Sequence, residues 1–224
     1  MSVTTLVFDA YGTLFDVTAA ARRAGADTPA LAQVWPALAG EWRRKQLEYT
    51  WLRAITGAHA DFAAVTADAL DWAMDAAGLS DPALRARLLA LYDELDPFPE
   101  AAEVLGHLKD SGFRLGILSN GTPAMLAAAT RAAGITGLFD AVLSVEEVRI
   151  YKPHASVYAL VERHLGASPQ RVLFVSSNGW DIAGAARFGF RTAWVNRAGL
   201  PVDRLPQRPL HEIPDLTHLP RLIA

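Results

Sequence analysis

Short apolar runs alternate with helical patterns over most of this chain. Five runs have the composition of β-strands, namely residues 3–8, 114–118, 141–144, 171–175 and 191–195. Three of them are nearly continuously apolar, which is typical of strands buried on both faces of a sheet. Since helical stretches separate these runs, the pattern predicts right-handed βαβ crossovers, a parallel sheet and the α/β class.

The helical stretches have recognisable ends. Apolar residues on one face predict a helix over 100–110 that stops at Gly112. Thr122 and Pro123 suit an N-cap and the proline of a first helical turn, and this helix is expected to close near Gly134.

Residues 16–97 interrupt the alternation, because they carry helical periodicity and no convincing strand. One predicted helix face has residues spaced four, three and four apart: Leu31, Trp35, Leu38 and Trp42. Ser80, Asp81 and Pro82 predict another helix start, and the Pro-Phe-Pro sequence at 97–99 predicts a rigid connection back to the main domain. The segment is therefore predicted to be a helical insertion that covers the sheet as a lid.

The predicted division of the chain has two parts. Residues 1–16 and 98–224 form an α/β core domain, and residues 17–97 form a helical cap domain. Prolines recur after Gly199, at positions 201, 206, 209, 214 and 220. Because proline lacks the backbone N–H that a strand or helix needs, they predict an irregular surface tail.

Composition narrows the class of protein. Hydrophobic residues make up 51% of the 224 residues and charged residues 20%, which supplies a buried core and argues against disorder. The net charge of −3 argues against nucleic-acid and membrane-surface partners, which both attract clustered Lys and Arg. The lack of cysteine excludes disulfides, cysteine-bearing zinc sites and Cys nucleophiles. No apolar run approaches the ~18 residues of a membrane span and no signal core is visible, so a cytoplasmic protein is expected.

Polar side chains follow the predicted strands at their carboxyl ends. In an open α/β sheet, ligands bind beyond this edge. The chain places there two carboxylates, one lysine and several hydroxyl and amide groups: Asp9, Tyr11, Thr13, Ser119, Asn120, Lys152, Ser176, Asn178 and Asp181. A catalytic site is therefore predicted at this edge.

These segments together resemble the four motifs of the haloacid dehalogenase superfamily, and in detail those of its L-2-haloacid dehalogenase branch. The matching segments are Asp-Ala-Tyr-Gly-Thr-Leu at 9–14, Leu-Ser-Asn-Gly at 118–121, Tyr-Lys-Pro at 151–153 and Ser-Ser-Asn-Gly-Trp-Asp at 176–181. Trp-Arg-Arg-Lys-Gln-Leu-Glu-Tyr at 42–49 also matches, so the resemblance covers essentially the whole chain. It implies a Rossmann-like parallel-sheet core domain with an inserted helical cap domain, and a homodimer.

The details of the resemblance imply a dehalogenase rather than a phosphatase. Phosphatases of this superfamily carry a second Asp two residues after the nucleophilic Asp, and acidic residues of the fourth motif help to hold Mg²⁺. Tyr11 and Ser177 occupy these places here, and Tyr, with a reference pKa of ~10, is a poor acid at neutral pH. A halide leaves without a proton, and Lys and Arg can hold a monoanionic haloacid, so no metal and no other cofactor is expected.

Two alternatives to a dehalogenase are a Mg²⁺-dependent small-molecule phosphatase of the same superfamily and a non-catalytic binding protein on the same scaffold. Tyr11 and Ser177 disfavour the first alternative. The presence of Asp9, Lys152 and Asp181 together disfavours the second, because binding alone needs no nucleophile.

The resemblance also implies catalytic roles. Asp9 would attack C2 of an (S)-2-haloalkanoic acid opposite the halogen and form an ester, and Lys152 would keep Asp9 ionised. Asp181, with Ser176 and Asn178, would activate the water that hydrolyses this ester to the (R)-2-hydroxy acid. A cap of the following helix is the other interpretation of Asp181.

Arg43 is expected to stabilise the departing halide, on which negative charge develops. Relatives often have Gln where this chain has Arg44, so both arginines are candidates to face the site.

Further residues are expected to bind the substrate. Ser119 and Asn120 suit its carboxylate, Tyr11 and Thr13 line the same pocket, and Tyr158 supports it. Three more residues would form the apolar wall: Leu47, Phe62 and Trp180. Packing in the protein core is the alternative for Tyr158 and for these apolar side chains. The expected partners are the haloacid and the halide, with no nucleic acid and no membrane.

Overall fold

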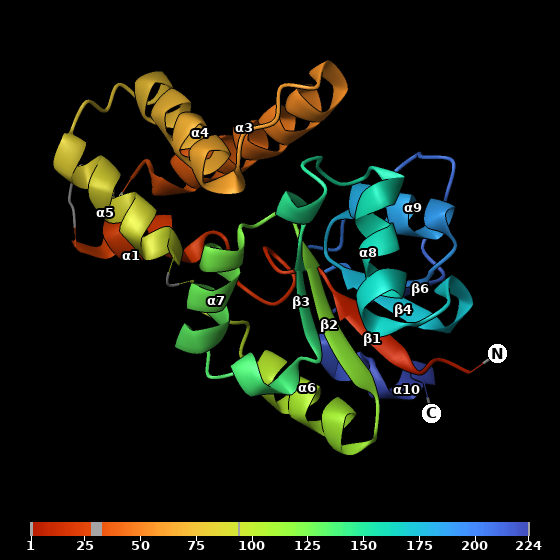
Figure 1. The fold of residues 1–224 in the computed structure, drawn as a ribbon. Helices are drawn as coiled ribbons and strands as arrows, with labels where there is room; N and C mark the ends of the chain where they lie inside the picture. The colour runs from red at the N-terminus through yellow and green to blue at the C-terminus, as the bar shows by residue number, and fades with distance from the viewer. Residues whose placement is uncertain (1, 28–32, 94, 224) are drawn as a thin grey trace.

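A six-stranded sheet forms the centre of the computed structural model, which describes residues 2–27, 33–93 and 95–223 (Figure 1). The strands are β1 (Thr5–Phe8), β2 (Arg114–Ser119), β3 (Ala141–Ser144), β4 (Val172–Ser176), β5 (Arg191–Val195) and β6 (His211–Ile213). Their order is β3-β2-β1-β4-β5-β6, and every neighbouring pair is parallel. The predicted parallel sheet and α/β class are confirmed.

The first strand lies in the middle of this sheet. Thr5 pairs with Arg114 of β2 and with Val172 of β4, and all four residues of β1 are buried. Because the three strands are parallel, their carboxyl ends meet at one edge of the sheet. The polar residues that follow them are therefore brought together from distant parts of the chain.

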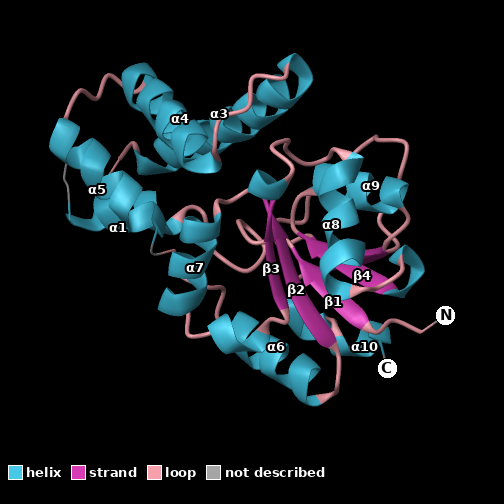
Figure 2. Ribbon diagram, viewed as in Figure 1, coloured by secondary structure: helices cyan, strands magenta, loops and turns pink. Residues whose placement is uncertain are grey.

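Helices cover both faces of the sheet. They are α6 (Ala101–Asp110), α7 (Pro123–Ala132), α8 (Ala155–Leu165), α9 (Gly179–Phe188) and α10 (Pro220–Ile223). Figure 2 shows α8 and α9 on one side of the sheet and α6 and α7 on the other. Short 3₁₀ turns lie at Thr136–Leu138, Val145–Glu147, Pro169–Arg171 and Leu216–His218. This alternation is the expected result of right-handed crossovers between parallel strands.

The predicted ends of two of these helices are confirmed. The Thr122 hydroxyl accepts a hydrogen bond of 3.2 Å from the Met125 N–H at the start of α7. Just beyond α6 and α7, Gly112 and Gly134 adopt the left-handed backbone region, with φ of +85° and +68°. A residue with a Cβ would be strained there, so glycine is favoured at both helix ends.

A group of helices lies between β1 and α6 in the chain: α1 (Ala19–Asp27), α3 (Trp35–Thr56), α4 (Phe62–Ala76) and α5 (Pro82–Asp93). They lie together beyond one end of the sheet (Figure 1). At the start of α5, the Asp81 carboxylate accepts hydrogen bonds from two backbone N–H groups, at 2.8 and 3.1 Å. Leu38 and Trp42 of the predicted helix face are buried and Trp35 is half-buried, whereas Leu31 lies outside the described residues.

The two segments that connect these helices to the sheet run side by side. The Asp16 N–H donates to the Asp96 carbonyl, and the Phe98 N–H donates to the Leu14 carbonyl, both at 2.9 Å. These contacts support the division into 1–16 with 98–224 and 17–97, which stays a prediction.

The prediction of an irregular tail after Gly199 is wrong for the last part of the chain. β6 extends the sheet beside β5, and the Asn196 N–H donates to the Ile213 carbonyl at 2.8 Å. Ile213, Leu216 and Leu219 are buried. Proline disfavours strands, but a strand of three residues fits between Pro209 and Pro214.

No helix in the described ranges is long and apolar enough to cross a membrane.

Candidate active site

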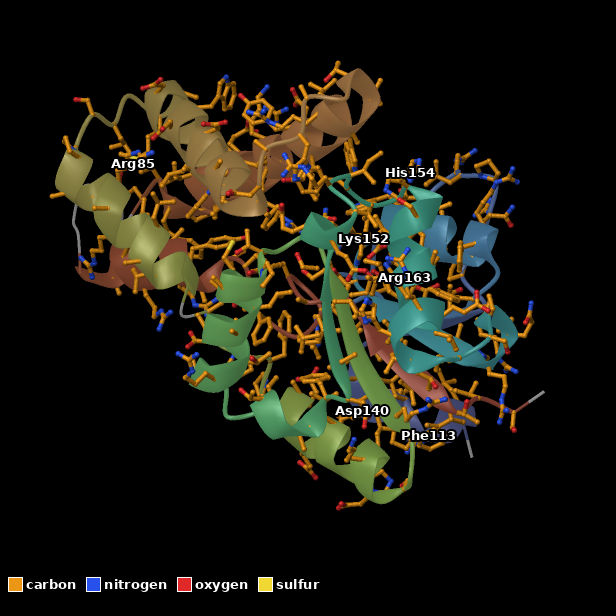
Figure 3. The ribbon with its side chains drawn as sticks, viewed as in Figure 1. Arg85, Phe113, Asp140, Lys152, His154 and Arg163 are labelled. Carbon is orange, nitrogen blue, oxygen red and sulfur yellow. The ribbon has the colours of Figure 1, made fainter. Side chains whose placement is uncertain are left out.

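Two buried carboxylates share one lysine at the carboxyl edge of the sheet. The Lys152 Nζ lies 3.1 Å from Asp9 Oδ1 and 2.8 Å from Asp181 Oδ2. The three side chains are 1%, 8% and 0% exposed, respectively. Figure 3 shows Lys152 at the end of the sheet that faces the inserted helices, whereas Phe113 and Asp140 mark the opposite end. The predicted site lies where parallel strands most often bind ligands.

The second oxygen of Asp9 faces neutral donors. Asp9 Oδ2 accepts hydrogen bonds from Asn178 Nδ2 at 2.9 Å and Thr13 Oγ1 at 3.2 Å, with Ser176 Oγ at 3.5 Å. The backbone N–H of Asp9 donates to the Val175 carbonyl of β4 at 2.9 Å. These contacts hold the carboxylate in one orientation.

The charges of Asp9, Lys152 and Asp181 influence the protonation of Lys152 and Asp181. Burial lowers the pKa of Lys152, but Asp181 and Asp9 outweigh burial and raise the pKa above its ordinary value. Burial has the largest effect on the pKa of Asp181 and raises it. Lys152 opposes this effect and the charge of Asp9 adds to it, so that the pKa of Asp181 is raised to about 6. The lysine therefore stays charged, and Asp181 is a carboxylate able to accept a proton near neutral pH.

Tyr158, which was expected to support the substrate pocket, lies against Asp181. Its hydroxyl donates to Asp181 Oδ1 at 2.8 Å, and its side chain is fully buried on α8. Asp181 is in the first turn of α9, but the N-cap position belongs to Asn178. The Asp181 carboxylate bonds to Lys152 and Tyr158, which favours the site over the helix-cap interpretation.

Of the two neighbouring arginines, Arg43 points to this group. Its Nη1 donates to Gln46 Oε1 at 2.8 Å, and its Nη2 donates to the Tyr11 carbonyl at 3.3 Å and to Asn178 Oδ1 at 3.4 Å. Arg44 points outward and pairs with Glu41 at 2.7 Å and Glu48 at 2.8 Å. α3 therefore presents one arginine to the carboxyl edge of the sheet and the other to its outer surface.

Aromatic side chains form the wall between the sheet and the inserted helices. The Tyr11 ring lies 5.5 Å from Phe62 and is stacked on Tyr92 at 5.6 Å, centroid to centroid. A Cβ at Gly121 would come within 2.7 Å of the Tyr11 ring, so only glycine fits there without displacement. Phe62 of the predicted apolar wall thus lies against Tyr11, which was expected to line the pocket.

Ser119 and Asn120 hold the loops of the site. Ser119 Oγ accepts a hydrogen bond of 3.1 Å from the Gly121 N–H, and Asn120 Oδ1 accepts one of 3.2 Å from the Lys152 N–H. Both side chains are buried, and Asn120 ties the loop after β2 to the segment that carries Lys152.

The two remaining predicted wall residues lie farther out. Leu47 is half-buried on α3. Trp180 is half-buried, and its ring packs edge-on against Trp51 at 5.4 Å. Trp180 lines a hollow with Trp51, Tyr151 and Pro153.

The site also contains residues that were not among the predicted site residues. Ser177 supports Thr13, because its N–H donates to Thr13 Oγ1 at 2.8 Å. Gln46 is buried beside Arg43, and Tyr92 is buried beside Gln46. The sequence could have indicated Gln46, because it lies four residues after Trp42 and therefore on the predicted apolar face of that helix. No sequence pattern indicated Tyr92.

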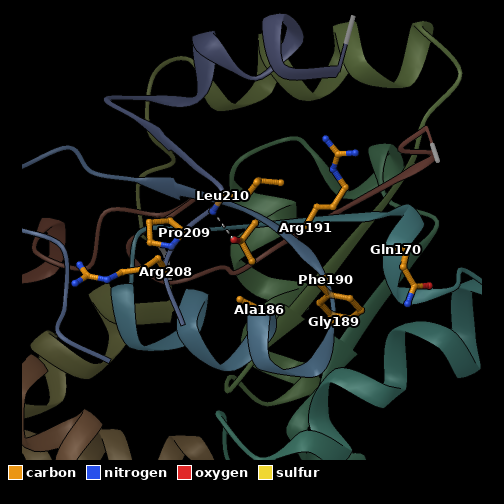
Figure 4. A pocket seen from close by; sticks show the side chains of 9 residues that line it. Gln170, Ala186, Gly189, Phe190, Arg191, Arg208, Pro209 and Leu210 are labelled. Atoms are coloured by element: carbon orange, nitrogen blue, oxygen red, sulfur yellow. Dashed lines mark hydrogen bonds between the residues drawn. The ribbon is translucent and has the colours of Figure 1, made fainter. Parts of the chain in front are cut away.

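A separate hollow of about 690 Å³ lies beside β5 (Figure 4). Its lining includes Arg191, the first residue of β5, and Gly189 after α9. This is the amino end of the strand, opposite to the edge that carries Asp9. The hollow is therefore not part of the candidate site.

The residues present do not fit the magnesium site of a phosphatase. Lys152 lies between the two carboxylates, and the two Asp181 oxygens bond to Lys152 and Tyr158. In the described part of the chain, no three His, Asp or Glu side chains gather in a metal-binding arrangement.

Comparisons with known proteins show the family of this chain. The chain matches the family model of haloacid dehalogenase-like hydrolases over residues 3–189. (S)-2-haloacid dehalogenase 1 of Pseudomonas sp. (strain CBS-3) is 44% identical over 220 residues, 97% of this chain and 95% of that protein. A solved dehalogenase with an intermediate complex has a TM-score of 0.95 at 40% identity, covering 100% of this chain and 98% of that one. The L-2-haloacid dehalogenase from Xanthobacter autotrophicus with chloropropionic acid covalently bound has a TM-score of 0.88 at 40% identity, covering 99% and 98%.

A parallel sheet with helices inserted after its first strand, and an Asp–Lys–Asp group at its carboxyl edge, define a hydrolase of the haloacid dehalogenase-like class. The chain belongs to this family and, within it, to the (S)-2-haloacid dehalogenases, hydrolases that act on carbon–halide bonds. The predicted family and enzyme class are confirmed.

Proposed function

We propose that this enzyme converts (S)-2-haloalkanoic acids into (R)-2-hydroxy acids and halide, with inversion at C2. The observation that carries the proposal is the buried Asp9 carboxylate, paired with Lys152 at 3.1 Å, beside an arginine from the inserted helices. An ionised carboxylate that is rigidly held and shielded from water is a suitable nucleophile. The relative with covalently bound chloropropionic acid supports the same substrate class.

The first step is a displacement at C2. An oxygen of Asp9 forms a bond to C2 from the side opposite the halogen, and the carbon–halogen bond breaks with its electron pair leaving on the halide. No proton is needed, because a halide is a stable anion. Arg43 supplies positive charge as the halide develops its negative charge. Ser119 and Asn120 bind the substrate carboxylate, and Tyr11 and Phe62 lie against its carbon chain, with Leu47 and Trp180 at the outer part of the wall.

The second step hydrolyses the Asp9 ester. Water attacks the ester carbonyl carbon and gives a proton to Asp181, with Ser176 and Asn178 beside the reacting group. The bond from this carbonyl carbon to the product oxygen breaks, and the product takes the proton back from Asp181 as its hydroxyl. The last proton of the water is released as Asp9 returns to a carboxylate. C2 is untouched here, so the inversion of the first step persists.

The ester-hydrolysis step is expected to slow as the pH falls, because only ionised Asp181 accepts the proton. Burial and the charge of Asp9 raise the pKa of Asp181 to about 6 in the free enzyme. The ester removes the charge of Asp9, so the midpoint of the hydrolysis step is expected below about pH 6. The decay of the trapped ester, followed by mass spectrometry from pH 4 to pH 8, measures it.

Tyr158→Phe provides the control for this pH dependence. Its hydroxyl donates to Asp181 and lowers the pKa of that carboxyl, so its loss is expected to move the midpoint to higher pH. A flat profile, or a midpoint that Tyr158→Phe moves to lower pH, would contradict the role of Asp181.

Substrate and metal dependence test the proposed function. Halide release is expected from (S)-2-chloropropionate and not from its (R) enantiomer, and it is expected to persist undiminished after exhaustive EDTA treatment. p-Nitrophenyl phosphate, assayed alongside, is expected to stay intact. Lost halide release that Mg²⁺ restores, together with phosphatase activity, would support the phosphatase alternative. A homodimer in the cytoplasm stays a prediction, and light scattering of the purified enzyme tests the dimer.

A further inference from the structure

A buried glutamine holds the arginine of the site. Gln46 lies on α3, three residues after Arg43, and is 1% exposed. Its Oε1 accepts the hydrogen bond from Arg43 Nη1 at 2.8 Å, which is shorter than the contacts of Nη2 to Tyr11 and Asn178. The Gln46 amide is therefore the closest group that orients the guanidinium.

The orientation of this amide follows from its neighbours. The Thr66 hydroxyl donates to the Phe62 carbonyl at 2.6 Å, so its oxygen is left as an acceptor for Gln46 Nε2 at 2.7 Å. The Tyr92 hydroxyl lies 3.0 Å from the same Nε2. With its N–H groups turned to Thr66 and Tyr92, Gln46 must present its carbonyl oxygen to Arg43.

The amide joins the arginine to three of the inserted helices. Gln46 is on α3, Thr66 on α4 and Tyr92 on α5, and Tyr92 stacks in turn on Tyr11, which follows β1. Burial raises the pKa of Tyr92, so this hydroxyl stays neutral. A fully bonded polar network of this kind restricts the side-chain rotamers of its members.

The acceptors of Arg43 share one property. The Gln46 amide, the Tyr11 carbonyl and the Asn178 amide are all neutral oxygens. Arg44 shows the contrast, since its acceptors are the carboxylates of Glu41 and Glu48. A carboxylate beside Arg43 would cancel the charge that a departing halide needs, whereas a neutral oxygen orients the guanidinium and leaves its charge free to act.

We propose that Gln46 is a positioning residue that aims Arg43 at the leaving halide and, by being neutral, preserves its positive charge. The inference rests on the proposed function, because it assigns to Gln46 an effect on the halide-release step. The chain thereby uses a glutamine where a glutamate of nearly the same shape would fit.

The test compares two replacements of Gln46 by single-turnover release of bromide and chloride. Gln46→Glu keeps the shape and neutralises Arg43, so halide release is expected to slow roughly 10²-fold, the scale of one lost electrostatic stabiliser. Gln46→Met keeps the volume and loses the hydrogen bond, so a loss of about tenfold is expected. The KM is expected to change little, because Gln46 does not contact the substrate carboxylate. Gln170→Glu makes the same chemical change at an exposed position and is expected to be without effect.

The same variants in an Arg43→Ala background separate positioning from packing. If Gln46 acts through Arg43, both replacements lose most of their effect once Arg43 is absent. An equal loss in both backgrounds, or a loss of folded enzyme in thermal denaturation that accounts for the slower release, would overturn the inference. Should Gln46→Glu fail to fold, Gln46→Met alone decides between these outcomes. If Arg43→Ala by itself leaves halide release unchanged, the proposed role of Arg43 fails instead.

Discussion

In H₂¹⁸O with the enzyme in molar excess over (S)-2-chloropropionate, the new hydroxyl of the product is expected to carry ordinary oxygen. Water attacks the carbonyl carbon of the Asp9 ester, so the oxygen that stays on C2 comes from Asp9. The heavy oxygen is expected almost entirely in the peptide that contains Asp9. Mass spectrometry of product and peptide after one turnover measures the partition. Stereochemistry cannot distinguish this covalent mechanism from one in which Asp9 is a general base that activates water, since both mechanisms invert C2.

Two variants accompany the isotope experiment. Asp9→Asn removes the nucleophile, and halide release is expected to fall by on the order of 10⁴ or more. Lys152 keeps Asp181 as its partner in this variant, so the fold is expected to persist. Asp16→Asn is the matched control, because Asp16 follows the same strand but bonds to Arg22 and Thr18. If ¹⁸O appeared in the product alone on the first turnover, Asp9 would be a general base and the covalent mechanism would be wrong.

Arg43→Ala is expected to lower kcat by roughly 10²–10³, the scale of losing one preorganised electrostatic stabiliser. The side chain is partly buried and held by Gln46 at 2.8 Å, so its charge acts where water cannot replace it. Stopped-flow measurement of halide release isolates the affected step. The loss is expected there and not in the decay of the ester.

The neighbouring arginine is the control for Arg43. Arg44→Ala removes an exposed side chain of the same helix whose ion pairs with Glu41 and Glu48 are solvated, and such pairs contribute little to stability. A change in kcat below about threefold is expected, because Arg44 points away from the site and its ion pairs are exposed to solvent. Equal losses in the two variants, or a larger loss in Arg44→Ala, would mean that the wrong arginine has been assigned to the halide.

Local sequence patterns predicted much of the fold. Strands buried on both faces must be apolar throughout, so β1 and β4 stood out as apolar runs in the sequence. Thr122 marked a helix start because its hydroxyl satisfies a free backbone N–H within its own turn. Asp9, Lys152 and Asp181 could be grouped because parallel strands deliver their carboxyl ends to one edge, whatever their separation along the chain.

Other features depended on contacts that no local pattern encodes. β6 is three residues long and follows a proline-rich stretch, so only pairing with β5 makes it a strand. Arg43 and Arg44 are adjacent in sequence and chemically identical, and the direction of each is set by how α3 packs. Tyr92 lies far along the chain from Tyr11, and only the packing of α5 brings the two rings together.

The sequence by itself thus determined the parallel sheet, the helical insertion and the set of groups at the carboxyl edge, because periodicity, capping and strand ends are local or follow from parallel topology. Tertiary structure alone decided which arginine enters the site, that Gln46 turns its carbonyl oxygen toward that arginine, and that residues 211–213 form a sixth strand. These depend on side chains from separate helices and strands meeting in one buried place, where each polar group must find a partner.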